Sequence, residues 1–384
     1  MRRIAIGCQG GGTHTAFTAG ALAALIKEQL AHQDFEIVAL SGTSGGAIGA
    51  LLAWYGLLLD GGPAAIDRLE HFWQDGFPRG GAAQLVADRL ANAAAVAALR
   101  LPTMTEVSPY TADRLLSLIP RSAQEPLRVW FDAQTGLRTI IEAFVDFSTI
   151  PALVARDRSR RELLIGAAEV LSGNFVVFRG TNPDFSVDAV VASGSLPELA
   201  RATVIGSGRY AGVYWDGLYS QNPPISDFFD LGEGGVEDKP DEIWLIRINP
   251  EARDSEPRTL LDISDRRNEM GANQSLQTEL SRARSINQLA EAFIATGTAL
   301  GATSAEALAQ FETSPLAGLL RRYKPVVLPE PIVMAPAVSG RLDHASKFDR
   351  NPAFLRKLLT HGQDQALAFL ERRRQSAQWR ATTV

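Results

Sequence analysis

The sequence predicts an α/β fold with a mainly parallel central sheet. Two short apolar segments, 3–8 and 35–40, have the length and character of buried strands. Each is followed almost at once by a longer segment with helical apolar spacing, at 15–30 and 45–59. Strands and helices that alternate in this way typically form a parallel sheet with crossover helices.

The segment 61–126 has a different character and predicts a helical insertion beside the sheet. Ala-rich helical stretches at 82–99 and 111–119 alternate with breakers such as Leu101-Pro102. Two interpretations stay open. The insertion is either a helical layer packed on the sheet, or a lid or wall that binds an acyl chain.

Strand-like segments return after the insertion, and no flexible linker separates them from the rest. The chain of 384 residues is therefore predicted to be one domain, with motifs over about 4–230 and a C-terminal extension over about 250–384. The later elements that the patterns predict are strands at 163–170, 175–178, 202–205, 210–215, 242–248 and 324–334, and helices at 187–192, 265–300 and 352–373.

Composition excludes several classes of function. The net charge of −5 gives no basic field that would favour a nucleic-acid partner. The single cysteine, Cys8, excludes an intrachain disulfide framework and a cysteine zinc site. The five histidines lack metal-binding spacing, so neither a metal nor a cofactor is expected.

The N-terminal sequence predicts a cytoplasmic protein. The longest nearly apolar run, 47–59, is shorter than the roughly 18 residues of a membrane span. The basic start of the chain could begin a signal peptide, but Gly10-Gly11-Gly12 interrupts any apolar continuation.

The most informative segment is the turn Gly42-Thr43-Ser44-Gly45-Gly46 between the second predicted strand and its helix. A serine on such a turn projects its hydroxyl outward, and glycines two residues before and after it, Gly42 and Gly46, leave room for the strained backbone. The helix that begins at Gly45 directs free N–H groups and its positive dipole end to the same point. This arrangement is typical of a nucleophile elbow.

Three loops follow strands, and together they suit acyl transfer. They carry Gly10-Gly11-Gly12, Ser44 and Asp216. Loops at the carboxyl ends of strands in an open α/β sheet form sites together. Acyl transfer needs a nucleophile, a base and donors for an oxyanion, and a glycine run can supply backbone donors. A phosphate loop or a plain turn is the alternative for this run, but Thr15 breaks the G-x-G-x-x-G spacing and no Gly-Lys-Ser/Thr follows.

Four motifs in this order resemble the patatin-like phospholipases. They are the glycine run before a helix, Gly42-Thr-Ser44-Gly-Gly46, Ala192-Ser193 with Pro197, and Trp215-Asp216-Gly217. The resemblance implies a three-layer α/β/α fold and acyl ester hydrolysis. It implies that Ser44 is the nucleophile and Asp216 its base, and that Gly10, Gly11 and Gly12 supply oxyanion donors.

The sequence departs from the family pattern at two places. Thr13-His14-Thr15 stands where the family commonly has Arg or Lys and then Gly, and Leu218 replaces a second small residue after Gly217. His14 either contacts the substrate in place of the missing cation or faces solvent at the helix start. Histidine is mostly neutral at pH 7, which favours the solvent-facing interpretation.

Other mechanisms and functions stay open. An α/β-hydrolase would use Ser44 with an intervening Asp and His344 or His361, in the chain order that this fold requires. A non-catalytic lipid-binding scaffold and acyl transfer to an acceptor other than water are further alternatives. The substrate class is also open among phospholipid, neutral glyceride, simple ester and polyester oligomer. Peripheral membrane contact would follow from a bilayer lipid substrate.

Overall fold

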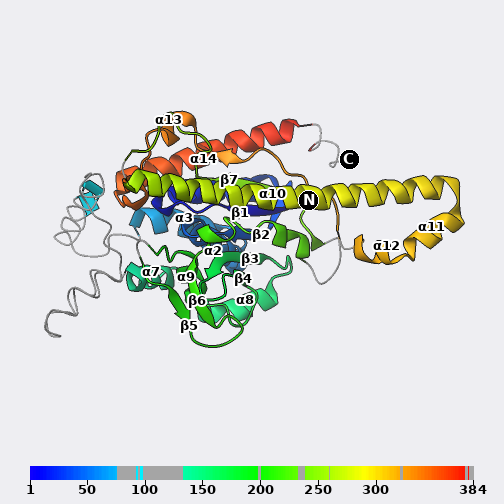
Figure 1. Cartoon of the computed structure of the whole chain (residues 1–384), viewed down its shortest axis with the longest axis horizontal. Coiled ribbons are helices and arrows are strands. Elements are labelled where there is room, and N and C mark those ends of the chain that lie inside the picture. The colour runs from blue at the N-terminus through cyan, green and yellow to red at the C-terminus, as the bar shows by residue number, and fades with distance from the viewer. Residues whose placement is uncertain are drawn as a thin grey trace.

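A mixed, mainly parallel sheet forms the centre of the protein (Figure 1). The computed structural model describes residues 1–75, 92–93, 96–97, 133–197, 200–231, 238–258, 260–320, 323–376 and 379. The strand order is β5-β6-β3-β2-β1-β7-β8, with β4 paired to β3 outside this path. The strands are β1 Arg2–Cys8, β2 Phe35–Gly42, β3 Glu162–Glu169, β4 Phe175–Arg179, β5 Thr203–Ile205, β6 Gly212–Asp216, β7 Glu242–Arg247 and β8 Ile332–Val333.

The parallel part of the sheet brings the predicted motif loops to one edge. Strand β1 runs parallel to both β2 and β7, and β2 runs parallel to β3. Cys8 at the end of β1 is in register with Gly42 at the end of β2. The glycine run and the Ser44 turn therefore leave neighbouring strands at the same end. Strands β4 and β6 pair with β3 in the antiparallel sense, and β6 carries Asp216 at its end.

Four helices cover one face of the sheet: α1 Ala16–His32, α2 Gly45–Asp60, α3 Pro63–Asp75 and α14 Pro352–Gln375. Helices α1 and α14 approach each other with almost no side chain between their backbones. A Cβ atom added at Gly20 of α1 would lie 1.9 Å from the Leu359 carbonyl oxygen, and one at Gly362 would lie 2.0 Å from that of Phe17. The last helix is thus part of the main core, although it lies more than 300 residues from α1 in the sequence.

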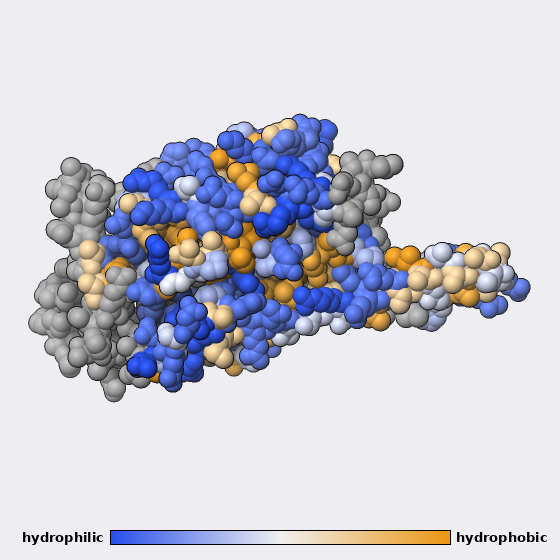
Figure 2. Space-filling view, turned by 90° about the horizontal axis from the view of Figure 1, so that it is seen from above, coloured by the Kyte–Doolittle hydropathy of each residue, from blue (hydrophilic) through white to orange (hydrophobic). Residues whose placement is uncertain are grey.

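The long helix α10, Leu260–Thr303, covers the opposite face. Leu276, Leu280 and Ala283 of α10 share a buried cluster with Ala5 and Leu164 of the sheet. The second half of α10 projects beyond the body with α11, Ala305–Glu312, and α12, Pro315–Leu320 (Figures 1 and 2). Figure 2 shows many apolar residues on this projection, where Leu289 and Ile294 are exposed.

With helices on both faces of the central sheet, the structure confirms the predicted three-layer α/β/α fold. The shorter helices are α7 Ala133–Glu142, α8 Ile150–Arg156, α9 Val187–Ser193 and α13 Pro336–Ser339, with 3-10 turns at Gly12–Thr15, Phe147–Thr149, Gly217–Tyr219, Ser226–Asp230 and Ala345–Phe348. Among the described helices, none has both the length and the apolar character needed to cross a membrane.

The predicted strand at 324–334 is wrong over most of its length. Only Ile332–Val333 forms a strand, and Val327 makes an isolated bridge to Glu242. Pro325, Pro329 and Pro331 interrupt the segment, and a proline cannot donate a ladder hydrogen bond.

Only part of the predicted insertion can be compared with the structure. Helix α3 is its first described element. The predicted helix at 111–119 and most of the one at 82–99 lie outside the described residues.

Candidate active site

Ser44 occupies a strained turn between β2 and α2. Its backbone angles are φ 55° and ψ −129°, in a region that residues other than glycine rarely adopt. The turn is so tight that a Cβ atom at Gly42 would lie 2.5 Å from the Gly46 carbonyl oxygen. A Cβ atom at Gly46 would lie 2.3 Å from the Cys8 carbonyl oxygen. Both positions therefore require glycine, and the turn packs directly against the end of β1.

Ser193 holds the backbone of this turn. The Ser44 N–H donates to the Ser193 Oγ at 3.0 Å, and the Ser193 hydroxyl donates to the Gly166 carbonyl oxygen at 2.7 Å. Ser193 is fully buried at the end of α9, and Gly166 belongs to β3. The Ala192-Ser193 motif thus ties the Ser44 turn to the sheet.

The glycine run contacts the Ser44 turn and is fixed by two asparagines. A Cβ atom at Gly10 would lie only 2.9 Å from the Ser44 Cβ. The Gly10 N–H donates to the Asn222 Oδ1 at 2.7 Å, and the Asn249 Nδ2 donates to the Gly10 carbonyl oxygen at 3.2 Å. The Gly10 N–H is therefore already engaged within the protein. The N–H groups of Gly11 and Gly12 donate to no backbone acceptor among the described residues.

Asp216 ends β6 in a fully buried position beside the Ser44 turn. Its Oδ1 accepts the Leu218 N–H at 2.8 Å, which fixes one side of the carboxylate. The following residue is packed closely, because a Cβ atom at Gly217 would lie 2.8 Å from the Thr43 Cγ2. The Asp216 turn therefore contacts the residue that precedes Ser44.

One cavity joins these three loops. It contains about 500 Å³ of empty space, part of which is open to solvent. Ser44, Asp216 and the three glycines line it on one side, together with Leu196 and Leu218. Its other lining residues include Asp265, Asn268 and Glu269 of α10, and His344, Lys347 and Phe348. The C-terminal extension thus contributes a wall of the cavity.

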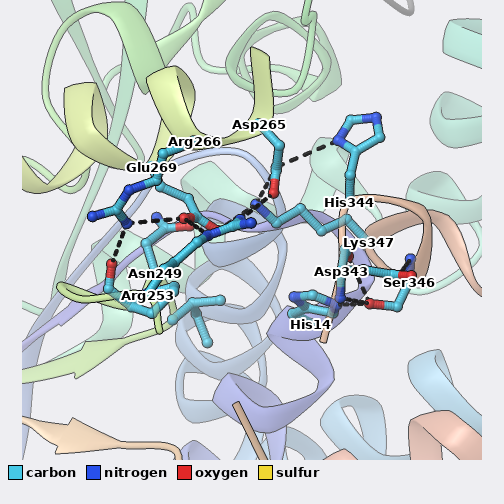
Figure 3. Close-up of polar contacts among 12 residues, drawn as sticks. His14, Asn249, Arg253, Asp265, Arg266, Glu269, Asp343, His344, Ser346 and Lys347 are labelled. Atoms are coloured by element: carbon cyan, nitrogen blue, oxygen red, sulfur yellow. Dashed lines mark hydrogen bonds and ion pairs between the residues drawn. The ribbon is translucent and has the colours of Figure 1, made fainter. Parts of the chain in front are cut away.

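This wall is part of a network of charged side chains, here called the cavity cluster: Arg253, Asp265, Arg266, Glu269, His344 and Lys347 (Figure 3). The Arg253 guanidinium contacts both Asp265 and Glu269 at 2.7 Å. On the other side, the Lys347 Nζ lies 2.5 Å from the Asp265 Oδ1 and 3.3 Å from the Glu269 Oε1.

The charges of the cavity cluster stabilise one another. Burial by itself raises the pKa of Asp265, but hydrogen bonds from His344 and Lys347 and the charge of Lys347 hold this pKa well below its ordinary value. Hydrogen bonds to Glu269 raise the pKa of Arg253 above its ordinary value. Asp265 is therefore ionised at neutral pH. Both Asp265 and Glu269 contact more than one basic side chain.

His14 is buried, so the solvent-facing interpretation is wrong. Its side chain packs under residues 343–348, and its Nε2 lies 2.8 Å from the Ser346 Oγ. Burial lowers the pKa of His14 to about 3, and the nearby charge of Lys347 adds to this effect. His14 is absent from the lining of the described cavity.

The two histidines of the α/β-hydrolase alternative lie in different places. The His361 Nε2 accepts the Ala335 N–H at 3.0 Å, and His361 does not belong to the lining of the described cavity. His344 does line the cavity, and its Nδ1 lies 3.3 Å from the Asp265 Oδ1. A Ser–His–Asp mechanism in this structure would therefore use Ser44, His344 and Asp265.

Sequence reasoning missed the residues that support the site and form its second wall. Only two of them, Asp265 and Glu269, left a clear signal, since they are four residues apart in a predicted helix and must share one of its faces. The missed residues are Asn222, Asn249, Arg253, Asp265, Glu269 and Lys347. In the described part of the chain, His, Cys, Asp and Glu side chains nowhere form a group of three or more that could hold a metal ion.

Comparison with known proteins gives one family match. A family model described as patatin-like phospholipase matches residues 8–229. No curated protein sequence matches the chain.

Among solved structures, the chain is similar to VipD from Legionella pneumophila, with 14% identity and a TM-score of 0.42 over 96% of this chain and 67% of VipD. It is also similar to a chain of the ExoU–SpcU complex from the type III secretion system of Pseudomonas aeruginosa, with 16% identity and a TM-score of 0.29 over 82% of this chain and 67% of that one.

Proposed function

Because the chain belongs to the patatin-like phospholipase family, we propose that it hydrolyses acyl esters of lipids with Ser44 as nucleophile and Asp216 as base. One observation carries this proposal. Ser44 stands on a turn with φ 55° at the head of α2, and it lines the same cavity as Asp216 and the glycine run. A backbone strained in this way is typical of a serine that must present its hydroxyl to a substrate.

In the first half of the reaction, the Ser44 hydroxyl attacks the ester carbonyl carbon while its proton passes to the Asp216 carboxylate. The tetrahedral intermediate then collapses, the alcohol leaves with that proton, and the acyl group remains on the Ser44 oxygen. A carboxylate is a weak base for an alcohol, so proton transfer must accompany attack. Burial of Asp216 at this position helps, because it removes competing water from the carboxylate.

Strong stabilisation of the oxyanion is then essential. We assign this role to the N–H groups of Gly11 and Gly12, since Asn222 already accepts the Gly10 N–H. The N-terminus of α2 adds the positive end of a helix dipole at the same place. Removal of one such donor typically costs roughly 100-fold or more in rate.

In the second half, Asp216 takes a proton from water, and the hydroxide attacks the acyl group on Ser44. The second tetrahedral intermediate then collapses, and Asp216 returns this proton to the Ser44 oxygen. The products are a free fatty acid and regenerated Ser44. An alcohol acceptor in place of water would give transacylation through the same intermediate. A bilayer lipid as substrate would bring the protein to a membrane surface.

A fluorophosphonate probe tests the proposal directly. We expect a covalent adduct on Ser44, mapped by peptide mass spectrometry, and no adduct with the Ser44→Ala variant. A chain-length series of nitrophenyl esters, followed by phospholipid and neutral glyceride vesicles, then defines the acyl group and the lipid class. Absence of an adduct in folded wild-type protein would instead support the non-catalytic scaffold.

Paired variants separate the Ser–Asp mechanism from the Ser–His–Asp alternative. Asp216→Asn keeps the side-chain shape but removes the base, so we expect ester turnover to fall on the order of 1,000-fold or more. His344→Ala should retain far more activity. If His344→Ala loses turnover as completely as Ser44→Ala while Asp216→Asn retains it, the base is His344.

A further inference from the structure

A short segment of the C-terminal extension holds the glycine run in place. The Thr13 hydroxyl donates to the Ser346 carbonyl oxygen at 3.0 Å, and the His14 Nε2 lies 2.8 Å from the Ser346 Oγ. Gly12 fits directly under this segment, because a Cβ atom there would lie 2.4 Å from the Lys347 carbonyl oxygen. Gly12 also has φ +58°, so both its conformation and its surroundings require glycine.

Residues 343–348 also form a rigid turn of their own. The Ser346 N–H donates to the Asp343 Oδ1 at 2.8 Å, and the Ser346 hydroxyl donates to the Asp343 carbonyl oxygen at 2.7 Å. Movement of one end of this turn would therefore move the other, and with it the backbone above Gly12.

Lys347 fastens the turn to α10. Its ammonium lies between the carboxylates of Asp265 and Glu269, at 2.5 Å and 3.3 Å (Figure 3). These carboxylates are only 3% exposed, and Arg253 holds them from the other side. The ammonium is thus confined to one position, which in turn confines the Lys347 backbone that rests on Gly12.

We propose that Lys347 is a positioning residue for catalysis, which holds the glycine run so that the N–H groups of Gly11 and Gly12 face the Ser44 substrate. This inference rests on the proposed function. It places a residue outside the family match, 8–229, in control of the oxyanion loop. The positioning depends on the positive charge of Lys347, because its ammonium acts through two carboxylates and not through contact with the reacting ester.

The test compares Lys347→Ala with Lys347→Arg on an uncharged nitrophenyl ester. We expect Lys347→Ala to lower kcat by about 10- to 100-fold with KM nearly unchanged, since misplacement of a catalytic group by about 1 Å can cost this much. The rate of Ser44 phosphonylation should fall in parallel. Lys347→Arg keeps the charge and should restore most of both rates.

Lys324→Ala is the matched control. Lys324 likewise forms an ion pair, with its Nζ 2.8 Å from Asp241, but it does not line the cavity. Both rates should stay at the wild-type level in this variant. Lys347→Ala should also fold, because Arg253 still contacts both carboxylates. If it does not, Ser346→Ala removes the His14 contact without any change in charge and should slow both rates.

Hydrogen exchange gives a readout that does not depend on activity. Amide exchange in a peptide over residues 9–16 should be faster in Lys347→Ala than in wild type, and near wild type in Lys347→Arg and Lys324→Ala. Wild-type exchange and wild-type phosphonylation in Lys347→Ala would overturn the inference. A raised KM with unchanged kcat would also overturn it, because Lys347 would then bind substrate. Failure of wild-type protein to label at all would refute the proposed function instead.

Discussion

Two buried groups of charged residues serve different purposes in this molecule. The first, here called the core cluster, consists of Arg2, Glu242 and Arg373 and lies at the amino ends of β1 and β7. The second is the cavity cluster beside Ser44, at the carboxyl ends of the strands. Both pair carboxylates with guanidinium groups at about the same distance, 2.8 Å and 2.7 Å.

The core cluster is closed to solvent and saturated. Glu242 is fully buried, and its two oxygens accept four hydrogen bonds, from Arg2, from two nitrogens of Arg373 and from the Trp244 indole. The Arg2 guanidinium also stacks 4.1 Å from the Trp379 ring centre. It thereby joins the first strand to the end of the chain.

The cavity cluster is partly open. The side chains of Lys347, Arg266 and Arg253 are 13%, 19% and 24% exposed, and Lys347 lines the cavity. The same chemistry therefore stabilises the fold in one place and shapes a site in the other. The cluster at the amino ends of the strands stabilises the fold, and the cluster at their carboxyl ends, beside the cavity, shapes the site.

The largest effect is expected from a break in the core cluster. Glu242→Gln leaves two buried guanidinium groups without a counter-charge, which typically costs about 3–5 kcal/mol. Urea unfolding followed by tryptophan fluorescence measures this loss. The fraction that remains folded should still react with a fluorophosphonate at the wild-type rate. A loss below about 1 kcal/mol, or slower labelling of the folded fraction, would contradict a purely structural role.

Glu269→Gln in the cavity cluster should lower stability less than Glu242→Gln does, but it should also lower turnover. Its basic partners are partly exposed, so the stability loss should be smaller, about 1–3 kcal/mol. Turnover per folded molecule should nevertheless fall about tenfold, because Lys347 loses one of its two carboxylate contacts. Unfolding and ester turnover measured on one preparation test both halves. Equal behaviour of Glu242→Gln and Glu269→Gln would remove the distinction between the clusters.

The difference between the clusters also explains what could be predicted from the sequence. The loops around Ser44 are recognisable because backbone geometry there admits few residue types. Gly42 and Gly46 have no room for a side chain, and glycines at this spacing around a serine form a pattern visible in the chain itself. The alternation of strands and helices predicted the layers, because this pattern too can be read from short stretches of sequence.

The partners within the two clusters could not be predicted, because they are brought together only by the fold. Arg2 and Glu242 of the core cluster are 240 residues apart, and Asp265 and Lys347 of the cavity cluster are 82 apart. His14 and Ser346, outside both clusters, are 332 apart. Lys, Arg, Asp and Glu occur throughout the chain, and nothing local separates Lys347 from a lysine on the surface. The solvent-facing expectation for His14 was wrong for this reason, since its cover comes from the far end of the sequence.

The next effect is a dependence of stability on pH at His14, which packs under the turn that carries Lys347. The pKa of His14 in the folded protein is about 3, below the ordinary value near 6.5. The unfolded chain therefore binds a proton at pH values where the folded protein does not. Proton uptake by His14 in the unfolded chain therefore lowers the free energy of unfolding as pH drops from about 6.5 towards about 3. The loss is roughly 1 kcal/mol per pH unit.

His14→Gln removes this proton uptake, so its stability should fall less steeply over that range than that of the wild type. Urea unfolding of both proteins at pH 7, 6 and 5 provides the comparison, and only the difference between the two slopes matters. Parallel slopes would mean that His14 takes up its proton in the folded state.

The smallest effect is expected at the ion pair between Lys324 and Asp241, which belongs to neither cluster. The Asp241 side chain is 40% exposed, so solvent screens the attraction between the two charges. Lys324→Ala should therefore change the free energy of unfolding by less than about 1 kcal/mol and leave turnover unaltered. Urea unfolding at low and at high salt checks this, because salt should reduce even the small wild-type advantage. A loss as large as that of Glu269→Gln would show that exposure does not rank these ion pairs, and the contrast between the two clusters would then need another cause.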